Sequence, residues 1–239
     1  MNHELKKPTI SAFFPCYNDA GTIASMVVLV DQTLRDVAND YEIIVIDDGS
    51  SDHSREVLQA LEKRFDKLRL LFHEKNRGYG GALRSGFSTA KMDLIFYTDG
   101  DFQYDVTELK KLLPMMNPEV DIVQGYKMKR HDPLHRIVIG RVYQYAMKAL
   151  FNLRIKDVDC DFRLIRRSVF SKINLEHNSG IICLEMIKKI QDAGFRFAEV
   201  PVNHFFRAYG KSQFFNFKRV FRVGLDIFKL WWKLVIMKT

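Results

Sequence analysis

Residues 42–52, with the sequence EIIVIDDGSSD, join a short apolar run to a cluster of acidic and turn-forming residues. The run Glu42–Asp47 is rich in isoleucine and valine, which predicts a buried strand. A helix over about Asp52–Phe65 is expected to follow, because the loop offers an N-cap in Ser50, Ser51 or Asp52. The stretch therefore predicts a strand, a polar loop and a helix in succession.

The same succession recurs on both sides of this stretch. Strands are predicted at Thr9–Phe14, Glu42–Asp47, Leu68–His73, Leu94–Thr98 and Asp121–Gly125, and helices at Gly21–Val37, Asp52–Phe65, Gly81–Lys91 and Val106–Met116. Beyond residue 130 we expect a helix at His135–Leu150, a strand at Asp161–Arg167, a helix at Ile181–Ala193 and a strand at Phe195–His204. Continuous apolar strands that alternate with helices predict an α/β fold with a mostly parallel central sheet and helices on both faces.

Composition indicates a chain that folds on its own. Of the 239 residues, 47% are hydrophobic and 28% are charged, which excludes an intrinsically disordered protein. No linker rich in Pro, Gly or Ser divides the chain, so we expect one domain over residues 1–212 and a separate helix over 213–239. The N-terminal residues lack the apolar run of a signal peptide, and the three cysteines form no CxxC pair, so a reducing, cytoplasmic setting is expected.

Polar clusters follow the first four predicted strands. They are residues 15–19 (PCYND), 47–52 (DDGSSD), 76–81 (NRGYGG) and 99–103 (DGDFQ). Because the carboxyl ends of parallel strands meet at one edge of the sheet, four such clusters predict one ligand site. Any one of them alone is equally explained as a capped turn.

The Asp99-Gly100-Asp101 segment places two carboxylates on a short turn, with the Gln103 amide two residues further on. Such oxygen ligands suit Mg²⁺ or Mn²⁺, which proteins commonly bind through one or two carboxylates together with substrate phosphates. The segment therefore predicts a metal site for a diphosphate. The competing interpretation is an acidic, solvent-exposed turn.

The Asp47-Asp48-Gly49-Ser50 loop offers a carboxylate to a base or a ribose, although its other residues are also explained as a helix cap. A glycine-rich loop at 78–81, beginning at Gly78, lets the backbone approach a ligand, but this signal is weak alone. Two familiar phosphate motifs are excluded. Phe205 stands where a P-loop needs its first glycine, and no GxGxxG follows the first strand.

Four segments, in order, carry a family resemblance: PCYND at 15–19, IVIDDGSSD at 44–52, EKNRGYGGALRSGF at 74–87 and YTDGDFQYD at 97–105. Over roughly residues 8–212 the chain resembles the inverting family 2 glycosyltransferases of the GT-A fold. More closely it is similar to polyprenyl-phosphate sugar transferases of the dolichol-phosphate mannose or glucose synthase type. The resemblance implies a GT-A domain over residues 1–212.

The resemblance also implies roles for particular residues. Nucleotide binding would fall to Pro15, Tyr17, Asp19, Asp47 and Asp48, and metal and diphosphate binding to Asp99, Asp101 and Gln103. An Arg-x-x-Gly-x-Ser segment that closes over the donor and acceptor phosphates would be Arg207, Gly210 and Ser212. Asp101, through the metal, and Arg207 would then be the catalytic residues that stabilise the departing diphosphate.

The acceptor side departs from the family pattern. Asp161 stands where relatives usually have Gly, and Lys127 stands where they usually have Arg. If the acceptor is a phosphate monoester, it is already an anion at neutral pH and needs little general-base help. Its phosphate could be held by Lys127, Lys129, Arg130 and Arg136, although these residues are equally explained as a solvated basic face.

The segment 214–237 is dense in aromatic and aliphatic residues, yet charged residues recur in it every three or four positions. This pattern predicts an amphipathic helix in the membrane interface rather than a spanning helix, because each charge in hydrocarbon is costly. Packing on the domain or on a partner subunit is the alternative. The charged residues over 213–239 are one aspartate, Asp226, and six basic residues: Lys218, Arg219, Arg222, Lys229, Lys233 and Lys238.

These observations lead to one main functional hypothesis. We expect a metal-dependent enzyme that moves a sugar from a nucleotide-sugar to a polyprenyl phosphate at the cytosolic membrane face. A family 2 transferase acting on a saccharide or lipid-linked glycan is the second hypothesis, and a non-catalytic membrane adaptor is the third. The net charge of +8 also allows nucleic-acid binding, but no RNA- or DNA-binding module is present, so no nucleic-acid partner is expected.

Overall fold

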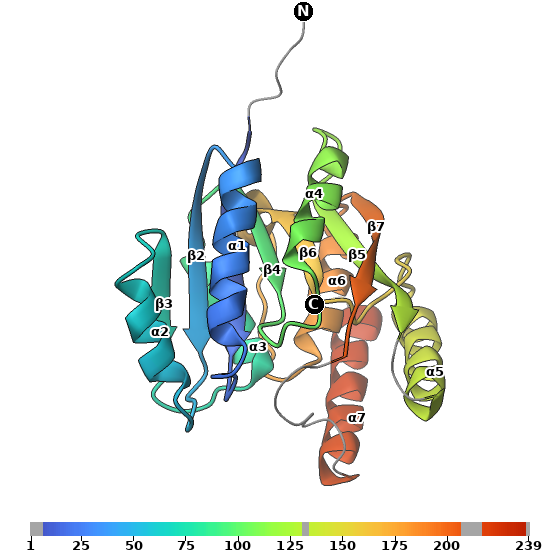
Figure 1. Cartoon of the computed structure of the whole chain (residues 1–239). Helices are drawn as coiled ribbons and strands as arrows, with labels where there is room; N and C mark the ends of the chain where they lie inside the picture. Colours follow the sequence, from blue (N-terminus) through green and yellow to red (C-terminus); the bar gives the residue numbers. More distant parts are fainter. Residues whose placement is uncertain (1–6, 131–133, 207–216, 238–239) are drawn as a thin grey trace, which may run out of the picture.

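A seven-stranded sheet forms the centre of the computed structural model, which describes residues 7–130, 134–206 and 217–237 (Figure 1). The strand order is β3-β2-β1-β4-β6-β5-β7. In chain order the strands are β1 (Thr9–Cys16), β2 (Asp40–Asp47), β3 (Leu68–Phe72), β4 (Leu94–Thr98), β5 (Ile122–Arg130), β6 (Phe162–Arg166) and β7 (Phe197–His204). The predicted mixed α/β architecture with a mostly parallel sheet is confirmed.

One strand, β6, runs against its neighbours. The pairs β1–β2, β1–β4, β2–β3 and β5–β7 are parallel, whereas β6 is antiparallel to both β4 and β5. As a result, the amino end of β6 lies at the same edge of the sheet as the carboxyl ends of the other strands. We call this edge the rim, and the polar clusters of the sequence follow strands that end there.

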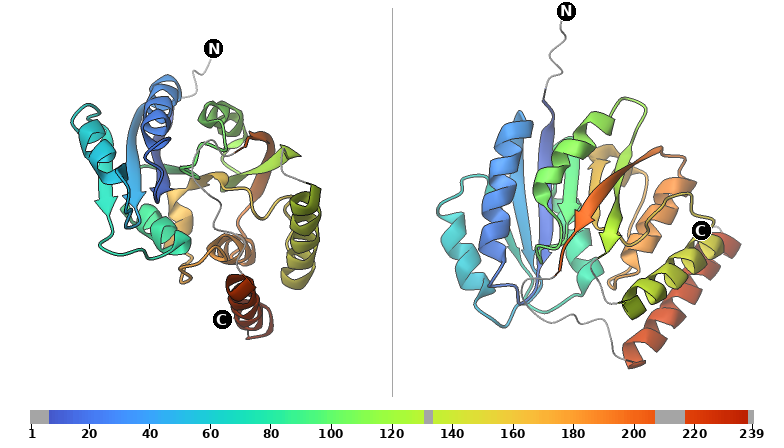
Figure 2. Two further views of the ribbon diagram at one scale, coloured as in Figure 1. Left: turned by 60° about the horizontal axis from the view of Figure 1, so that its bottom comes forward. Right: turned by 45° about the vertical axis from the view of Figure 1, so that its right-hand side comes forward.

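Helices cover both faces of the sheet (Figure 2). On one face, α1 (Ile23–Val37) lies over β1 and β2, α2 (Ser54–Glu62) over β3, and α4 (Leu109–Leu112) over β5 and β6, and all three contribute to the first apolar cluster. The opposite face packs against α3 (Tyr79–Thr89), α5 (Leu134–Phe151), α6 (Ile182–Asp192) and α7 (Phe217–Trp231). The alternation is visible in β1, where Phe14 belongs to the first apolar cluster and Phe13 to the second.

Three local predictions are corrected by the structure. The second helix has His53 at its N-cap position, and Asp52 instead accepts the Ser54 N–H at 3.0 Å. The helix predicted at 106–116 divides into η1 (Val106–Glu108), α4 and η2 (Leu113–Met115), with Pro114 in the last of these; proline lacks the N–H that an α-helix needs. Strand β5 continues five residues beyond the predicted end at Gly125, because it pairs with β7 as far as Arg130.

The C-terminal helix α7 continues as a π-helical turn, η4 (Trp232–Met237). Leu230 and Leu234 are buried in the second apolar cluster, whereas Phe228 and Trp232 are 59% and 49% exposed. Apolar side chains therefore lie on both the protein side and the solvent side of this helix. None of the helices in the described part of the chain is long and apolar enough to span a bilayer. The domain boundary at residue 212 stays a prediction.

Candidate active site

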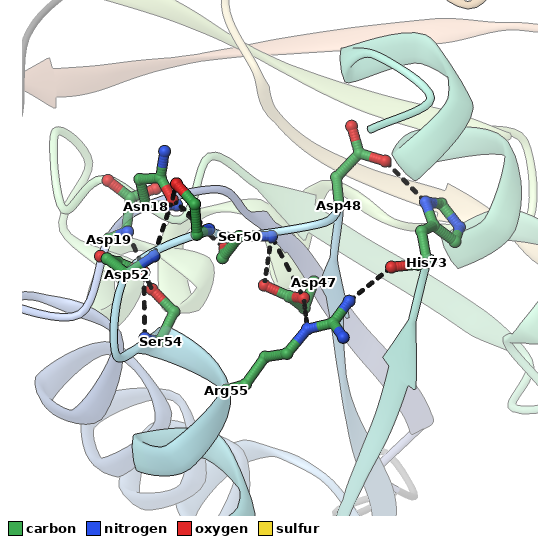
Figure 3. A network of polar contacts seen from close by, with 10 residues as sticks. Asn18, Asp19, Asp47, Asp48, Ser50, Asp52, Ser54, Arg55 and His73 are labelled. Atoms are coloured by element: carbon green, nitrogen blue, oxygen red, sulfur yellow. Dashed lines mark hydrogen bonds and ion pairs between the residues drawn. The ribbon is translucent and has the colours of Figure 1, made fainter. Parts of the chain in front are cut away.

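Backbone and side-chain hydrogen bonds join the loops that follow β1 and β2 (Figure 3). The Asn18 carboxamide oxygen accepts the Ser51 N–H at 2.8 Å, and the Asn18 N–H donates to the Ser50 hydroxyl at 3.0 Å. Asp19 is 5% exposed, and its N–H donates to the Ser54 hydroxyl at 3.1 Å. The structure thus brings together two polar clusters that lie about 30 residues apart in the sequence.

Both aspartates at the end of β2 are buried and already have partners. Asp47 accepts the Nε–H of Arg55 at 2.6 Å and is completely shielded from solvent. Asp48 is 2.6 Å from His73 Nδ1 and accepts the Arg77 N–H at 2.8 Å. These contacts fix the loop geometry, and a direct role of either carboxylate in nucleotide binding stays a prediction. Figure 3 shows the two pairs side by side.

The glycine-rich loop reaches the site through Gly78 and Tyr79. Gly78 has a φ of +81°, and a Cβ there would lie 2.5 Å from the Asn178 carbonyl oxygen, so only glycine fits. The next residue, Tyr79, begins α3, and its hydroxyl donates to Asp99 at 2.6 Å. The loop is therefore connected directly to the acidic turn after β4.

This acidic turn, residues 99–103, is packed closely against the end of β1. A Cβ at Gly100 would lie 2.2 Å from the Pro15 carbonyl oxygen, so the turn has no room for a side chain at that position. The Asp101 carboxylate accepts the Gln103 N–H at 3.1 Å, and the Gln103 side-chain amide donates to the Phe205 carbonyl at 3.0 Å. The turn is thus hydrogen-bonded to Phe205, the residue that follows β7.

The donor atoms of this turn fit a metal ion that is shared with a ligand. Asp99 and Asp101 supply carboxylate oxygens, while no group of three or more His, Cys, Asp and Glu residues able to hold a metal occurs among the described residues. Thr98, directly before the turn, has a buried hydroxyl oxygen without a hydrogen-bond partner. A Mg²⁺ or Mn²⁺ ion bound by two carboxylates and completed by substrate phosphates matches this arrangement.

A further carboxylate, that of the partly buried Asp161, lies at the amino end of β6, beside the acidic turn. Its Oδ1 accepts hydrogen bonds from Arg163 at 2.9 Å, Cys183 at 3.0 Å and Tyr97 at 3.2 Å. Burial raises the pKa of Asp161 to about 7. Burial, followed by the charges of Asp161 and Asp99, raises the pKa of Tyr79, so both carboxylates face the same phenol.

The residues expected on the acceptor side belong to β5 and α5, apart from those of segment 207–212. Lys127 donates from Nζ to the Asp159 carbonyl at 2.7 Å and borders a cavity of about 270 Å³. The cavity is lined by Tyr126, Lys127, Met128, Ile137, Arg141, Gln144, Lys156 and Asp157. The side chains of Arg130 and Arg136 lie outside the described part of β5 and α5, and Arg207, Gly210 and Ser212 lie outside the described residues altogether.

Several functional candidates were not found from the sequence. Arg55 and His73, the partners of Asp47 and Asp48, lie 8 and 25 residues from them. Tyr79 looked like one residue of a glycine loop, and Asp161 was noted only as a departure from a family pattern. The one available signal for Asp161 was its charge next to an apolar strand.

Comparison with known proteins identifies the family and the fold of the chain. The model of the family "Glycosyl transferase family 2" matches residues 11–174, well over half of the chain, and the chain belongs to that family. The structure of Mycobacterium tuberculosis glucosyl-3-phosphoglycerate synthase with Mn²⁺, UDP and glucosyl-3-phosphoglycerate has a TM-score of 0.71. The match is 16% identical and covers 95% of this chain and 79% of that chain, so it supports the GT-A fold.

Two curated relatives name a function. Glycosyltransferase AglD of Haloferax volcanii is 28% identical over 95% of this chain and 38% of its own length. Undecaprenyl-phosphate 4-deoxy-4-formamido-L-arabinose transferase of Aeromonas hydrophila is 27% identical over 86% of this chain and 62% of its own length. The chain therefore spans less than two thirds of each of these relatives.

Proposed function

We propose that this protein is an inverting glycosyltransferase that moves a sugar from a nucleotide-sugar to a polyprenyl phosphate. The observation that carries the proposal is the gathering of four polar clusters at one rim of a family 2 glycosyltransferase fold. The relative from Aeromonas hydrophila, an undecaprenyl-phosphate sugar transferase, supports this class of acceptor.

The donor would lie along the rim, with its nucleoside at the ends of β1 and β2. Pro15, Tyr17, Asp19 and the Asp47–Asp48 pair would surround the nucleoside, and Gly78 would allow the backbone to approach it. Tyr17 is 39% exposed and so is available for stacking on a base. The buried ion pairs of Asp47 and Asp48 would preorganise this end of the site before the ligand arrives.

Asp99, Asp101 and Gln103 would hold a divalent metal, Mg²⁺ or Mn²⁺. When bound, such an ion would neutralise the charge that develops on the departing diphosphate. The structure of the mycobacterial synthase with Mn²⁺ and UDP, which has the same fold, supports the use of a divalent metal. Tyr79 would orient Asp99 toward the ion through its 2.6 Å hydrogen bond.

The reaction would be one direct displacement at the anomeric carbon. An oxygen of the acceptor phosphate forms the new bond to this carbon, while the bond to the diphosphate oxygen breaks and its electron pair leaves with the nucleoside diphosphate. A single displacement inverts the configuration. Because the acceptor is already an anion, the protein's task is alignment, and Lys127, Arg130 and Arg136 with Arg207 and Ser212 are proposed to hold its phosphate.

Membrane contact would come from α5 and α7. These helices meet where Trp231 Nε1 donates to the Leu150 carbonyl at 3.0 Å. Both present exposed apolar side chains, among them Val142 at 65% and Tyr145 at 71% on α5 and Phe228 at 59% on α7. Apolar side chains together with the basic residues of 214–237 are suited to a membrane surface, where a polyprenyl acceptor resides.

The proposal is tested by transfer to a lipid acceptor. The protein is first screened by thermal shift with Mn²⁺ against UDP-, GDP- and dTDP-hexoses, because a ligand of the folded state raises its melting temperature. The donor that stabilises the protein is then supplied, radiolabelled, with undecaprenyl phosphate in detergent. We expect a sugar-lipid product with inverted anomeric configuration.

Two outcomes would contradict the proposal. Label transfer to a saccharide acceptor and not to undecaprenyl phosphate would favour a family 2 enzyme that uses a hydroxyl acceptor. Binding to liposomes without transfer from any donor would favour the non-catalytic adaptor.

A further inference from the structure

The sheet order sets the sequence of ligand groups along the rim. From one side to the other, the strands β2, β1, β4, β6 and β5 bring the residues Asp47, Asp19, Asp99, Asp161 and Lys127 to this edge. Under the proposed function, the nucleoside lies at β2 and β1, the diphosphate at β4 and the acceptor phosphate at β5. One strand, β6, lies between the leaving group and the attacking group.

Direct displacement requires the sugar to occupy this interval, because its anomeric carbon bonds first to the diphosphate and then to the acceptor phosphate. The residue at the rim end of β6 is Asp161, since β6 runs antiparallel to its neighbours and pairs its first residue, Phe162, with Thr98. Lys127 acts on Asp161 electrostatically from the acceptor side. Asp161 therefore lies between the positions assigned to the two phosphates.

The carboxylate of Asp161 is rigidly held. Three donors, Tyr97, Arg163 and Cys183, all bind its Oδ1, and its side chain is only 14% exposed. Arg163 is itself fully buried and donates to the Val158 carbonyl at 2.7 Å and to the Gln124 side chain. A fixed carboxylate of this kind recognises neighbouring hydroxyl groups with little loss of side-chain entropy.

We propose that Asp161 binds hydroxyl groups of the donor's sugar and determines which sugar the enzyme accepts. The proposal rests on the proposed function for the order of ligand groups along the rim. The chemistry follows from the residue type, because a sugar offers O–H donors and a carboxylate is a strong acceptor for them. A site built around such a bond discriminates strongly against sugars that lack the hydroxyl or point it elsewhere.

The test separates the sugar from the nucleotide. Isothermal titration with Mn²⁺ compares the nucleotide-sugar found in the screen with the corresponding sugar-free nucleoside diphosphate, in the wild type and in Asp161→Asn. At a pH above the raised pKa of Asp161, where its carboxylate is charged, we expect the variant to bind the nucleotide-sugar roughly ten- to a hundredfold more weakly, as for a lost hydrogen bond to a charged group. Its affinity for the nucleoside diphosphate should stay within about twofold, a split that a merely structural role would not produce.

Two further variants make the test decisive. Asp161→Glu retains a negative charge beside Arg163 but displaces the carboxylate, and it should show the same selective loss if Asp161→Asn folds poorly. Asp93→Asn makes the same charge change on an exposed aspartate at the opposite edge of the sheet, and it should bind both ligands like the wild type.

Each remaining outcome has a definite meaning. Equal loss of affinity for both ligands in both Asp161 variants would assign the residue a structural role and overturn the proposal. Unchanged affinity for the nucleotide-sugar would overturn it as well. Absence of transfer by the wild type would instead contradict the proposed function. The difference in affinity between the nucleotide-sugar and the nucleoside diphosphate could still be measured in that case.

Discussion

The two ends of the rim differ in how their charged groups are neutralised. At the proposed nucleotide end, formed by the loops after β1, β2 and β3, the buried Asp47 and Asp48 are paired with Arg55 and His73. At the proposed acceptor end, formed by β5 and α5, three basic side chains and one carboxylate line a cavity: Lys127, Arg141, Lys156 and Asp157. The acidic side chains of the first end are therefore buried in ion pairs, whereas the mainly basic side chains of the second end border a cavity.

Under the proposed function, the two ends of the rim bind ligands of different kinds. A nucleotide is a common, soluble and rigidly shaped ligand, so a prearranged pocket lowers the cost of binding it. A lipid phosphate arrives from a membrane, and exposed apolar helices beside a basic cavity allow it to approach without leaving the interface. Experiments on each end and on the turn between them test whether the two ends have these different roles.

The largest effect is expected at the turn between the two ends. Asp101→Asn should lower the transfer rate by roughly 10²–10³-fold, because it weakens the stabilisation of charge on the leaving diphosphate. Manganese affinity, measured by electron paramagnetic resonance in the presence of nucleoside diphosphate, should fall with it. Asp105→Asn is the matched control, since Asp105 caps η1 and accepts the Thr107 N–H at 3.0 Å. Equal activity of both variants would remove Asp101 from the metal site.

The proposed membrane-facing side of the proposed acceptor end gives the next largest effect. Phe228→Glu combined with Trp232→Glu should lower partitioning to phosphatidylglycerol-containing vesicles roughly tenfold or more, because it removes exposed apolar surface from α7 and η4. Co-sedimentation measures the bound fraction. Met115→Glu changes an apolar side chain that is 41% exposed on η2 and should not alter binding. Equal binding of all three proteins would show that α7 does not face the membrane.

The nucleotide end is tested through the partner of Asp48. His73 is 2% exposed, and His73→Ala would leave the buried Asp48 without this partner, which should cost about 1–3 kcal/mol in the free energy of unfolding. Urea titration followed by circular dichroism measures this change. His53→Ala removes a histidine whose side chain is 87% exposed and should leave the unfolding midpoint nearly unchanged. Similar midpoints for the two variants would refute a prearranged pocket.

The smallest effect concerns Glu185, which holds residues 176–177 beside the glycine-rich loop. Burial alone would raise the pKa of Glu185, but hydrogen bonds from His177 and Lys189 outweigh it and lower the pKa to about 2. Because the folded-state pKa is below its ordinary value near 4.5, this stabilisation is complete above pH 4.5 and is lost as the pH falls toward 2. Glu185→Gln should make the free energy of unfolding depend less on pH in that window, as measured by urea unfolding at several pH values. If the free energy of unfolding of the variant falls with pH as steeply as that of the wild type, Glu185 does not make this contribution.

The sequence predicted most of what is local and buried. The strand at Leu94–Thr98 has the predicted bounds, because five consecutive apolar or β-forming residues with turn residues after them permit few alternatives. The meeting of the four polar clusters followed from parallel strand direction alone. The antiparallel pairing of β6 was not predicted, since periodicity shows that a strand exists and leaves its direction open.

Long-range partners account for the rest. Nothing near Asp48 identifies His73 as its partner, and nothing near Asp99 identifies Tyr79, because these contacts depend on how β3 and α3 are placed beside the rim. The sequence pattern also did not show which apolar side chains of α7 are exposed to solvent. An interfacial helix was predicted, with packing on the domain as the alternative, and the structure shows Leu230 and Leu234 in contact with the protein core while Phe228 and Trp232 are exposed.

Because β6 runs in the reverse direction, two neighbouring carboxylates of the rim come from different connections of the chain. Asp161 precedes its strand and belongs to the connection from α5, while Asp99 follows β4 and belongs to the connection toward β5. Val158 and Cys160 are fully buried, and their carbonyls accept hydrogen bonds from Arg163 and Gln124, so most of the connection before Asp161 is fixed by the core. If Asp161 selects the sugar as proposed, a change of sugar would depend on this one side chain, and an engineer would alter it while keeping residues 157–160.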